Sequence, residues 1–440
     1  MLLSFGMLNG ENFCFRVYLK DKGLSGYSTD NPEFFLSQAA ISRRQKESIP
    51  VDTSDLPIAR SYLDTLNILG AKPVVTSKWF STVVVECKDS TTAGLLETLS
   101  IVDSVKCVWK GIRHTPSGLC RDTSRLFPED LPQHTVYGYA DTQINMLHGA
   151  PLHEEGYRGK GMKVAVIDAG FMNADRMAVF DSLRLEGTYN AVSPGESVFL
   201  DDEHGTKVLS CLAANAPGVM VGTAPEASYW LIKSEDGSSE YPIEEDYWTA
   251  AVEFADSAGV QVISSSLGYY AFDDCTLSYH PSMLDGKTAF ISRAAQKAAS
   301  KGLLLFISAG NEGNGSWKTL TFPSDAPHVL TVGSITQNKE KSTFSSAGFT
   351  ADARVKPDVV ALGTNCAVID SSGSIRYASG TSFSTPTVAG LGICLWQALP
   401  QLNNLEIIDR IRRSSSHYAR PDAELGYGIP NLYNALRNEP

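Results

Sequence analysis

The sequence predicts an α/β protein with a doubly wound, mostly parallel sheet, preceded by a small α+β domain. From about Gly161 onward, short runs of β-branched residues alternate with helical stretches, which is typical of a parallel sheet covered on both faces. Before Gly111, strands and helices are instead mixed. Between the two regions, residues 113–135 hold three prolines, scattered charge and little apolar periodicity, which predicts a linker. The predicted domains are therefore 11–112 and 136–440.

The first domain is predicted from a strand, a helical region, two strands, a helix and a strand. The segments, in that order, are 13–20, a polar helical region at 31–70, 74–77, 80–87, a helix with Leu95, Leu96 and Leu99 on one face, and 102–110. Four short strands and intervening helices are enough for a small α+β unit with its own core.

The second domain is predicted from an alternation of strands and helices. Its elements are strand 162–168, a helix that opens at His204, strand 228–234, helix 247–258, strand 260–266, helix 287–301, strands 303–310 and 328–334, and a helix that starts near Ser382. In such sheets ligands bind outside the carboxyl ends of the strands. We therefore expect functional residues to follow strands directly.

Composition excludes several classes of protein. The 440 residues are 43% hydrophobic and 20% charged, which is typical of a globular chain and not of a disordered or fibrous one. Since 37 Lys and Arg stand against 49 Asp and Glu, the net charge of -12 gives no field that attracts phosphates, and we expect no nucleic acid partner. No apolar run approaches the roughly 18 residues of a membrane span, so we expect no transmembrane segment.

The first ten residues and the cysteines leave alternatives open. Residues 1–10 are either a truncated signal segment or a plain N-terminal tail, because they are briefly apolar but have no basic residue and no clear cleavage site. The eight cysteines contain no C-x-x-C pair, which argues against a zinc ribbon or a thioredoxin-type motif. They are either buried free thiols or, in an exported protein, include one or two disulfides.

Four residues at the ends of predicted elements combine into a recognisable set. Asp168 ends an apolar strand, His204 precedes Gly205 at a helix start, Asn311 directly follows a strand, and Ser382 stands just before an apolar helix. Taken singly, each has an ordinary structural explanation as a turn, cap or helix-start residue. Together they supply an acid, a base, an amide donor and a hydroxyl. A metal site is a weaker interpretation, because neither the His204 segment nor the one at His153 is an H-E-x-x-H motif.

The sequence resembles the subtilisin-like serine peptidases, or subtilases, in the order of Asp168, His204 and Ser382 and in the motifs around them. The matching sequence motifs are VAVIDAG, HGT, ISAGNEGN and GTSFSTP, in that order along the chain. The resemblance covers roughly Tyr137 to the C-terminus. It implies a subtilisin-like fold and a serine endopeptidase that acts on polypeptides through an acyl-enzyme.

The chemistry explains why these residue types are needed. Ser382 would be the nucleophile, His204 the base that takes its proton, and Asp168 the acceptor that orients the imidazole. Asn311 and the Ser382 backbone N–H would form the oxyanion hole. With an ordinary histidine pKa of about 6.5, activity is expected to rise with pH through that value.

The resemblance also suggests a substrate cleft. Two strand ends would line it, with an extended substrate added as a further strand; the residues are Ser266, Leu267 and Gly268 in one strand end, and Ser308, Ala309 and Gly310 in the other. Alternatively, these small residues serve only for packing inside the sheet. Two departures from the family pattern affect the surface near the site: Lys207 stands where many relatives carry histidine, and the loop after Asp168 lacks the usual His-Pro.

The resemblance also has implications for the N-terminal domain and for the processing and export of the protein. A module of this size before a subtilase resembles the family's propeptide, a ferredoxin-like domain that assists folding and inhibits the enzyme; the alternative is an accessory domain that stays attached. It implies an exported precursor, secreted or located in the periplasm or cell envelope. No catalytic cofactor is expected. Structural calcium is frequent in the family, but no ligand loop can be assigned here. Two alternatives to hydrolysis are peptide transfer or cyclisation, with 269–287 as the insertion that would favour it, and a non-catalytic binding module.

Overall fold

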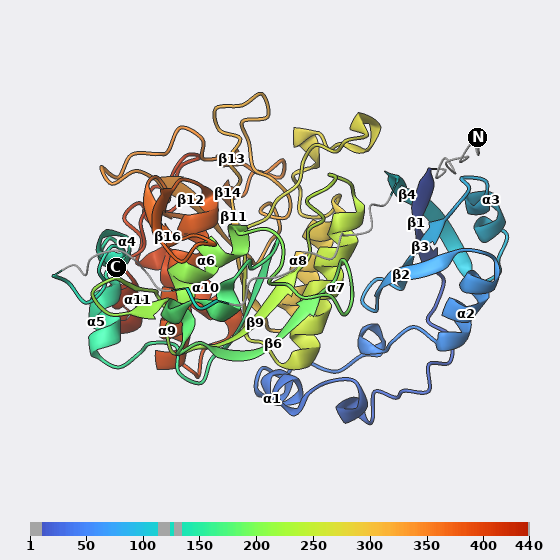
Figure 1. The fold of residues 1–440 in the computed structure, drawn as a ribbon, viewed down its shortest axis with the longest axis horizontal. Coiled ribbons are helices and arrows are strands. Elements are labelled where there is room, and N and C mark those ends of the chain that lie inside the picture. The colour runs from blue at the N-terminus through green and yellow to red at the C-terminus, as the bar shows by residue number, and fades with distance from the viewer. Residues whose placement is uncertain (1–10, 113–123, 127–133, 439–440) are drawn as a thin grey trace, which may run out of the picture.

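The computed structural model describes residues 11–112, 124–126 and 134–438, and these residues form two domains (Figure 1). The smaller domain contains four strands and three helices: β1 (Asn12–Leu19), α1 (Gln38–Lys46), α2 (Arg60–Ile68), β2 (Lys72–Ser77), β3 (Thr82–Cys87), α3 (Thr92–Glu97) and β4 (Val102–Gly111). Its strands form an antiparallel sheet in the order β2-β3-β1-β4. The predicted α+β unit is confirmed.

Alternation along β1 gives the small sheet two different faces. Phe15, Val17 and Leu19 point to one face and pack against Leu66 of α2 and Leu96 of α3, which closes the domain's own core. Cys14 belongs instead to the core cluster that the small domain shares with the larger one. The second face of the sheet is thus covered by the larger domain.

The larger domain is built on a seven-stranded parallel sheet. Its strands are β5 (Lys163–Asp168), β6 (Arg184–Asn190), β9 (Ser228–Lys233), β10 (Val262–Ser265), β11 (Leu304–Ser308), β12 (Leu330–Ile335) and β15 (Val359–Leu362). The spatial order is β15-β12-β11-β10-β5-β9-β6, and every neighbouring pair is parallel. The doubly wound parallel sheet predicted from the sequence is confirmed.

Helices cover both faces of this sheet. On one face lie α6 (His204–Ala213), α9 (Thr381–Ala398), α10 (Asn404–Arg413) and α11 (Leu432–Arg437), with the short helices α4 (Asp141–Asn145) and α5 (Gly149–Glu154). On the other face lie α7 (Ile243–Ala258) and α8 (Phe290–Ser300), which also stand between this sheet and the small domain (Figure 1). Successive residues of β5 serve the two cores in turn: Val164 and Val166 join the first cluster, Ala165 and Ile167 the second.

The remaining elements are short. Three two-stranded ribbons pair β7 (Asn215–Ala216) with β8 (Met220–Val221), β13 (Gly348–Phe349) with β14 (Val355–Lys356), and β16 (Cys366–Ile369) with β17 (Ile375–Ala378). Single 3₁₀ turns occupy Pro32–Phe34, Thr53–Asp55, Ala174–Arg176, Ala178–Phe180, Cys275–Leu277 and Pro281–Met283. None of the helices in the described residues combines the length and the apolar character that crossing a membrane requires.

Some elements differ from the sequence prediction. The helical region predicted at 31–70 consists of two helices, because Pro50 and Pro57 interrupt it. Helix α7 starts at Ile243, four residues earlier than predicted, and its first turn carries three acidic residues, which suits the positive end of the helix dipole. The cysteines at 87, 107, 211, 275, 366 and 394 are free thiols, and Cys120 lies outside the described residues.

Candidate active site

Asp168 ends β5 at the carboxyl edge of the parallel sheet. Its side chain is fully buried, and its Oδ1 accepts hydrogen bonds from the Ala169 N–H at 2.8 Å and from His204 Nδ1 at 2.7 Å. Within the described part of the chain, the second carboxylate oxygen has no hydrogen-bond partner. The carboxylate therefore fixes the imidazole tautomer, with the proton on Nδ1 and a free lone pair on Nε2.

His204 is the first residue of α6, and the next residue allows the helix to approach β5 closely. A Cβ on Gly205 would lie 2.3 Å from the Gly170 carbonyl oxygen and 3.0 Å from the Asp168 Cβ. Only glycine fits there without a shift. The His204 N–H also donates to the Asp202 carboxylate at 2.7 Å, which anchors the first turn of the helix.

Charges around His204 raise its pKa. Burial of the imidazole acts to lower the pKa, but the charge and hydrogen bond of Asp168, with smaller effects of Asp202 and Glu235, outweigh it and raise the pKa to about 8. The sequence-based expectation of about 6.5 is therefore too low.

Ser382 is the second residue of α9 and is almost fully buried. The ring of the adjacent Phe383 lies 6.0 Å from the His204 ring, centroid to centroid. Ser382 Oγ donates to the Ser266 carbonyl at 3.5 Å, and Ser266 Oγ donates back to the Ser382 carbonyl at 3.0 Å. Among the described residues no hydrogen bond joins Ser382 to His204.

Asn311 and the start of α9 present two N–H donors to one small space. Asn311 Oδ1 accepts from the Thr381 N–H at 2.9 Å and from the Thr381 hydroxyl at 3.0 Å, which leaves its Nδ2 free to donate. A Cβ placed on Gly380 would lie 3.7 Å from Asn311 Nδ2 and 3.6 Å from the Ser382 nitrogen. This geometry suits an oxyanion hole. Thr381, which orients the Asn311 side-chain amide, was not identified from the sequence, although it lies within the GTSFSTP motif.

The two strand ends proposed for the substrate cleft lie side by side. Ser266–Gly268 follows β10, and Ser308–Gly310 spans the end of β11, its neighbour in the sheet. The Ser308 hydroxyl donates to the Leu267 carbonyl at 3.5 Å, and Gly268 is exposed while the other residues are buried. An exposed strand end beside Ser382 is a suitable edge for an extended peptide.

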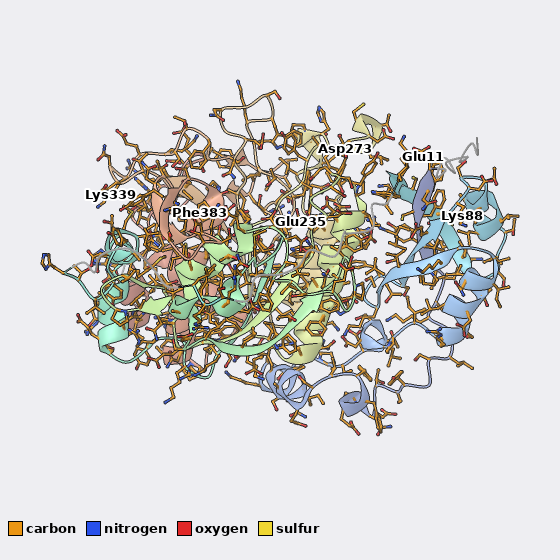
Figure 2. All side chains as sticks on the ribbon, viewed as in Figure 1. Glu11, Lys88, Glu235, Asp273, Lys339 and Phe383 are labelled. Carbon is orange, nitrogen blue, oxygen red and sulfur yellow. The ribbon has the colours of Figure 1, made fainter. Side chains whose placement is uncertain are left out.

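Glu235 was not found from the sequence. It stands two residues after β9, and the Tyr269 hydroxyl donates to its carboxylate. Burial, together with the nearby charges of Glu240 and Asp168, raises the pKa of Glu235. Figure 2 labels Glu235 and Phe383, which both lie in the central part of the larger domain.

The small domain is held to α7 by ion pairs and hydrogen bonds. Arg16 forms two bonds of 2.6 Å to Asp246, and Arg44 binds both Asp55 of its own domain and Asp256 of α7. Glu253, also on α7, accepts from the N–H groups of Lys78 and Trp79 at 2.9 and 3.0 Å. Buried charges of this kind are stable only when paired.

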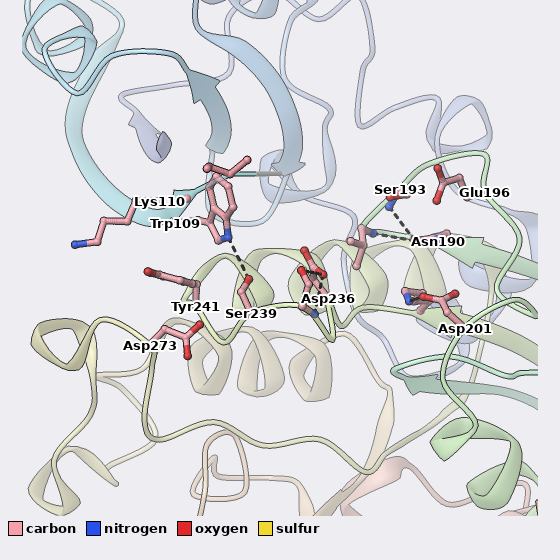
Figure 3. Close-up of a pocket in the computed structure, with 15 residues that line it drawn as sticks. Trp109, Lys110, Asn190, Ser193, Glu196, Asp201, Asp236, Ser239, Tyr241 and Asp273 are labelled. Atoms are coloured by element: carbon pink, nitrogen blue, oxygen red, sulfur yellow. Dashed lines mark hydrogen bonds and ion pairs between the residues drawn. The ribbon is translucent and has the colours of Figure 1, made fainter. Parts of the chain in front are cut away.

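The end of β4 reaches a cavity of about 490 Å³ at the domain boundary (Figure 3). The Trp109 indole N–H donates to Ser239 at 3.2 Å, and Lys110 pairs with Asp274 at 2.7 Å. The larger domain lines the cavity with the polar side chains of Asn190, Asp201, Asp236 and Asp273. The small domain thus directs its last strand toward the edge of the sheet on which Asp168 lies.

Comparisons with known proteins agree with this architecture. Residues 159–428, more than half of the chain, match the model of the subtilase family, peptidase family S8. The chain belongs to the subtilase family. Residues 14–119 of this subtilase match a second model, that of the peptidase S8 propeptide domain of Bacteroidota.

Individual relatives support the assignment. The subtilase is 30% identical to Subtilisin E of Bacillus subtilis (strain 168) over 328 residues, which cover 72% of this chain and 77% of the relative. It is also 30% identical to a subtilisin of Bacillus pumilus over 300 residues, 67% of this chain and 98% of the relative. A crystal structure of MycP1 with the N-terminal propeptide removed has a similar fold, with a TM-score of 0.54 at 24% identity over 70% of this chain and 97% of that one. The protein is therefore a serine endopeptidase with an N-terminal propeptide domain.

The two positions that depart from the family pattern, Lys207 and the loop after Asp168, make ion-pair and hydrogen-bond contacts with nearby residues. Lys207 forms an ion pair with Glu203, whose other oxygen accepts from the Ser371 N–H at 3.0 Å. In the loop after Asp168, the Asn173 amide donates to the Ser371 carbonyl at 2.8 Å. Glu203, the partner of Lys207, and the loop after Asp168 therefore contact the same turn, which contains Ser371. The domain boundaries at 112 and 136 stay predictions, since residues 113–123 and 127–133 lie outside the described part.

Proposed function

We propose that the subtilase cleaves peptide bonds through an acyl-enzyme, with Ser382, His204 and Asp168 as its catalytic triad. Ser382 Oγ attacks the peptide carbonyl carbon while its proton passes to His204 Nε2, and the imidazolium then protonates the leaving amine. Water deprotonated by His204 releases the acyl group in the second half of the reaction. The observation that carries the proposal is the 2.7 Å hydrogen bond between the fully buried Asp168 and His204.

Charge on the carbonyl oxygen would be stabilised by two donors. Asn311 Nδ2 and the Ser382 N–H face the space in front of Gly380, and the N-terminus of α9 adds its dipole. Hydroxyl, imidazole, carboxylate and amide groups supply every proton transfer and every charge interaction of the proposed reaction, so we propose that it needs no cofactor. Chelation is expected to leave the turnover of a short peptide unchanged.

The test is covalent labelling of the serine. Wild-type protein is expected to react with a fluorophosphonate at Ser382, and Ser382→Ala is expected to lose both the label and turnover, by a factor on the order of 10⁶ in kcat, as in subtilisin. Peptide turnover that survives in Ser382→Ala would overturn the proposal. Product masses distinguish hydrolysis from transfer, because only transfer joins two peptides.

We also propose that the propeptide domain inhibits the enzyme in the same chain and assists its folding. The ion pairs on α7 and the course of β4 toward the active-site edge support this role. Ser382→Ala protein is expected to stay at full length, whereas active protein would be cut within 112–135. Inhibition by the domain added in trans is the second expected result. An uncut and fully active 440-residue enzyme would contradict both roles.

The propeptide domain is also the reason to propose export. A subtilase that carries its own inhibitor is suited to be made as a precursor and activated after secretion, or after delivery to the periplasm or cell envelope. Fractionation of the producing cells, with detection of the mature fragment, tests this localisation.

A further inference from the structure

The start of α7 binds the guanidinium group of Arg16, which strand β1 presents from the propeptide domain. Arg16 Nε and Nη2 donate to the two carboxylate oxygens of Asp246, each at 2.6 Å, and Nη2 also donates to the Pro242 carbonyl oxygen at 3.1 Å. Both Arg16 and Asp246 are buried. Three oxygen atoms of the larger domain thus bind one buried guanidinium group.

An aromatic ring and a second carboxylate complete this site on the larger domain. The centre of the Phe290 ring, at the start of α8, lies 3.8 Å from Arg16 Cζ. Glu245 Oε2 lies 3.6 Å from Arg16 Nη2; it is buried and, within the described residues, has no hydrogen-bond partner. The other oxygen, Oε1, accepts from the Tyr279 hydroxyl at 2.6 Å. The larger domain therefore holds the Glu245 carboxylate in place, with its free oxygen toward the guanidinium group.

This arrangement favours a guanidinium group over other cations. Two parallel bonds to both oxygens of Asp246 require a planar fork of donors, and the face of the same group lies on the Phe290 ring. A lysine ammonium group is a compact point charge without such a fork. An ion such as Ca²⁺ takes about six to eight oxygen ligands, more than the described site supplies. The site is therefore shaped for an arginine side chain.

Loss of the propeptide domain would vacate this site and leave its groups without partners. Within the part of the chain that the structure describes, neither Asp246 nor Glu245 pairs with a cation of the larger domain. The ring of Phe290 would be uncovered too, since Phe80 of the propeptide domain packs against it at 5.0 Å between ring centres. Because buried carboxylates are unstable without a counter-charge, the vacated site favours a new cation of the same shape.

The rest of the uncovered face of α7 is acidic as well. Asp256, farther along the helix, pairs with Arg43 and Arg44 of the propeptide domain and would lose both. A field of this sign attracts basic polypeptides and disfavours acidic ones. Charge on this face thus indicates the kind of partner that the site fits.

We propose that, once the propeptide domain has left, the site formed by Asp246, Glu245, Pro242 and Phe290 is an exosite that binds an arginine side chain of another polypeptide. The arginine enters as Arg16 does, with its fork on Asp246 and its face on Phe290. The inference rests on the proposed function, because the site opens only when the propeptide domain has been cut off and released.

The first experiment uses enzyme that has cut itself and whose Ser382 has then been blocked with a fluorophosphonate, so that a peptide is neither hydrolysed nor bound as a substrate. Calorimetry compares Gly-Arg-Gly amide with Gly-Lys-Gly amide. We expect the arginine peptide to bind at least about tenfold more tightly, since only arginine forms the bidentate pair. Equal affinities, or no saturable binding of the arginine peptide up to about 10 mM, would overturn the proposal.

Two variants and a control locate the binding. Asp246→Asn is expected to weaken binding of the arginine peptide by about tenfold or more. Phe290→Leu removes the ring face but keeps an apolar side chain, and is expected to weaken it by about 2- to 30-fold. Asp409→Asn is the matched control, because Asp409 is a half-exposed carboxylate of α10 that also pairs with an arginine, Arg413. An equal loss in the control would place the binding elsewhere and overturn the proposal.

Full-length protein tests the shape of the same site without any processing. Arg16→Ala in the Ser382→Ala background removes the guanidinium group, so methylguanidinium is expected to raise its unfolding temperature saturably. Methylammonium is expected to need at least about tenfold more for the same rise, and Asp246→Asn added to Arg16→Ala should abolish the rise. A rise with Ca²⁺ alone would indicate a metal site and overturn the proposal.

Failure of this inference is distinguishable from failure of the proposed function. If the enzyme labels at Ser382 and cuts itself but does not bind the arginine peptide, the proposed function stands and the exosite falls. If the protein stays uncut and fully active, Arg16 keeps its place and the exosite falls, while the label shows that the triad stands. If wild type is not labelled, the triad fails, and rescue of Arg16→Ala by methylguanidinium still decides the specificity of the site. Where Arg16→Ala does not fold, the calorimetry decides.

Discussion

Gly205→Ala is expected to slow the enzyme although it substitutes none of the proposed catalytic residues. The added Cβ would lie 2.3 Å from the Gly170 carbonyl oxygen, whereas a carbon–oxygen contact needs about 3.3 Å. Sideways relief is blocked by Phe171 Cε1 at 2.9 Å and the Asp168 Cβ at 3.0 Å. The first turn of α6 therefore has to move by about 1 Å, and His204 moves with it. A misplacement of this size costs about 10²-fold in rate.

The assay measures kcat and KM on one peptide, together with thermal unfolding and the rate of fluorophosphonate labelling. We expect kcat to fall by about 10²-fold with little change in KM, since the substrate cleft is untouched. Gly237→Ala is the matched control, because a Cβ there meets nothing within 4 Å. Wild-type kcat in Gly205→Ala, or an equal loss in Gly237→Ala, would refute the reasoning.

Four further predictions concern the site and the domain boundary. Because His204 has to be neutral to act as a base and its pKa is raised to about 8, kcat/KM should rise with pH through that value and be roughly 1% of its maximum at pH 6; a profile flat from pH 6 to 8 contradicts this. Glu235→Gln removes a carboxyl group whose ionised form raises this pKa, and because the pKa of Glu235 is itself raised by burial the midpoint should move to lower pH by only a small step; an unchanged midpoint would separate Glu235 from His204. Asn311→Leu should lower kcat by about 10²- to 10³-fold with little change in KM, the loss known for this donor in subtilisin; a KM effect alone would make Asn311 a ground-state binding residue. Arg44→Ala removes one of two cationic partners from each of two buried carboxylates, with Lys301 left on Asp55 and Arg43 left on Asp256, so the precursor should lose about 1.5–3 kcal/mol of stability, measured by denaturant unfolding, and an unchanged midpoint would show that the remaining partners replace the arginine.

The parallel sheet could be predicted because its buried strands are short runs of β-branched residues that alternate with helical stretches along the chain. The small sheet could be predicted from strand-like segments mixed with helical ones. Strand β6, with the sequence RLEGTYN, escaped prediction since it lies at the sheet edge and most of its residues are not buried. Strand β15 is a fully buried run of only four residues, which periodicity alone does not distinguish from part of a helix.

Candidate site residues could be predicted from the sequence where they follow a strand or begin a helix within a distinctive sequence motif. Thr381 and Glu235 were missed because their roles depend on contacts between segments far apart in the chain. The raised pKa of His204 could not be predicted for the same reason, because the charges that raise it come from segments far apart in the chain. Sequence patterns report local geometry, and none of these three properties is local.

Helix α9 supplies Ser382 near the end of a 440-residue chain, while β5 supplies Asp168 from its first half. During synthesis, Ser382 and the N–H groups at the start of α9 emerge from the ribosome long after Asp168 and His204. The propeptide domain and most of the parallel sheet are already outside by then. If the proposed triad carries out the chemistry, a nascent chain has no means of cutting its neighbours or the translation machinery until α9 has been made, and by that time the propeptide domain has long been complete.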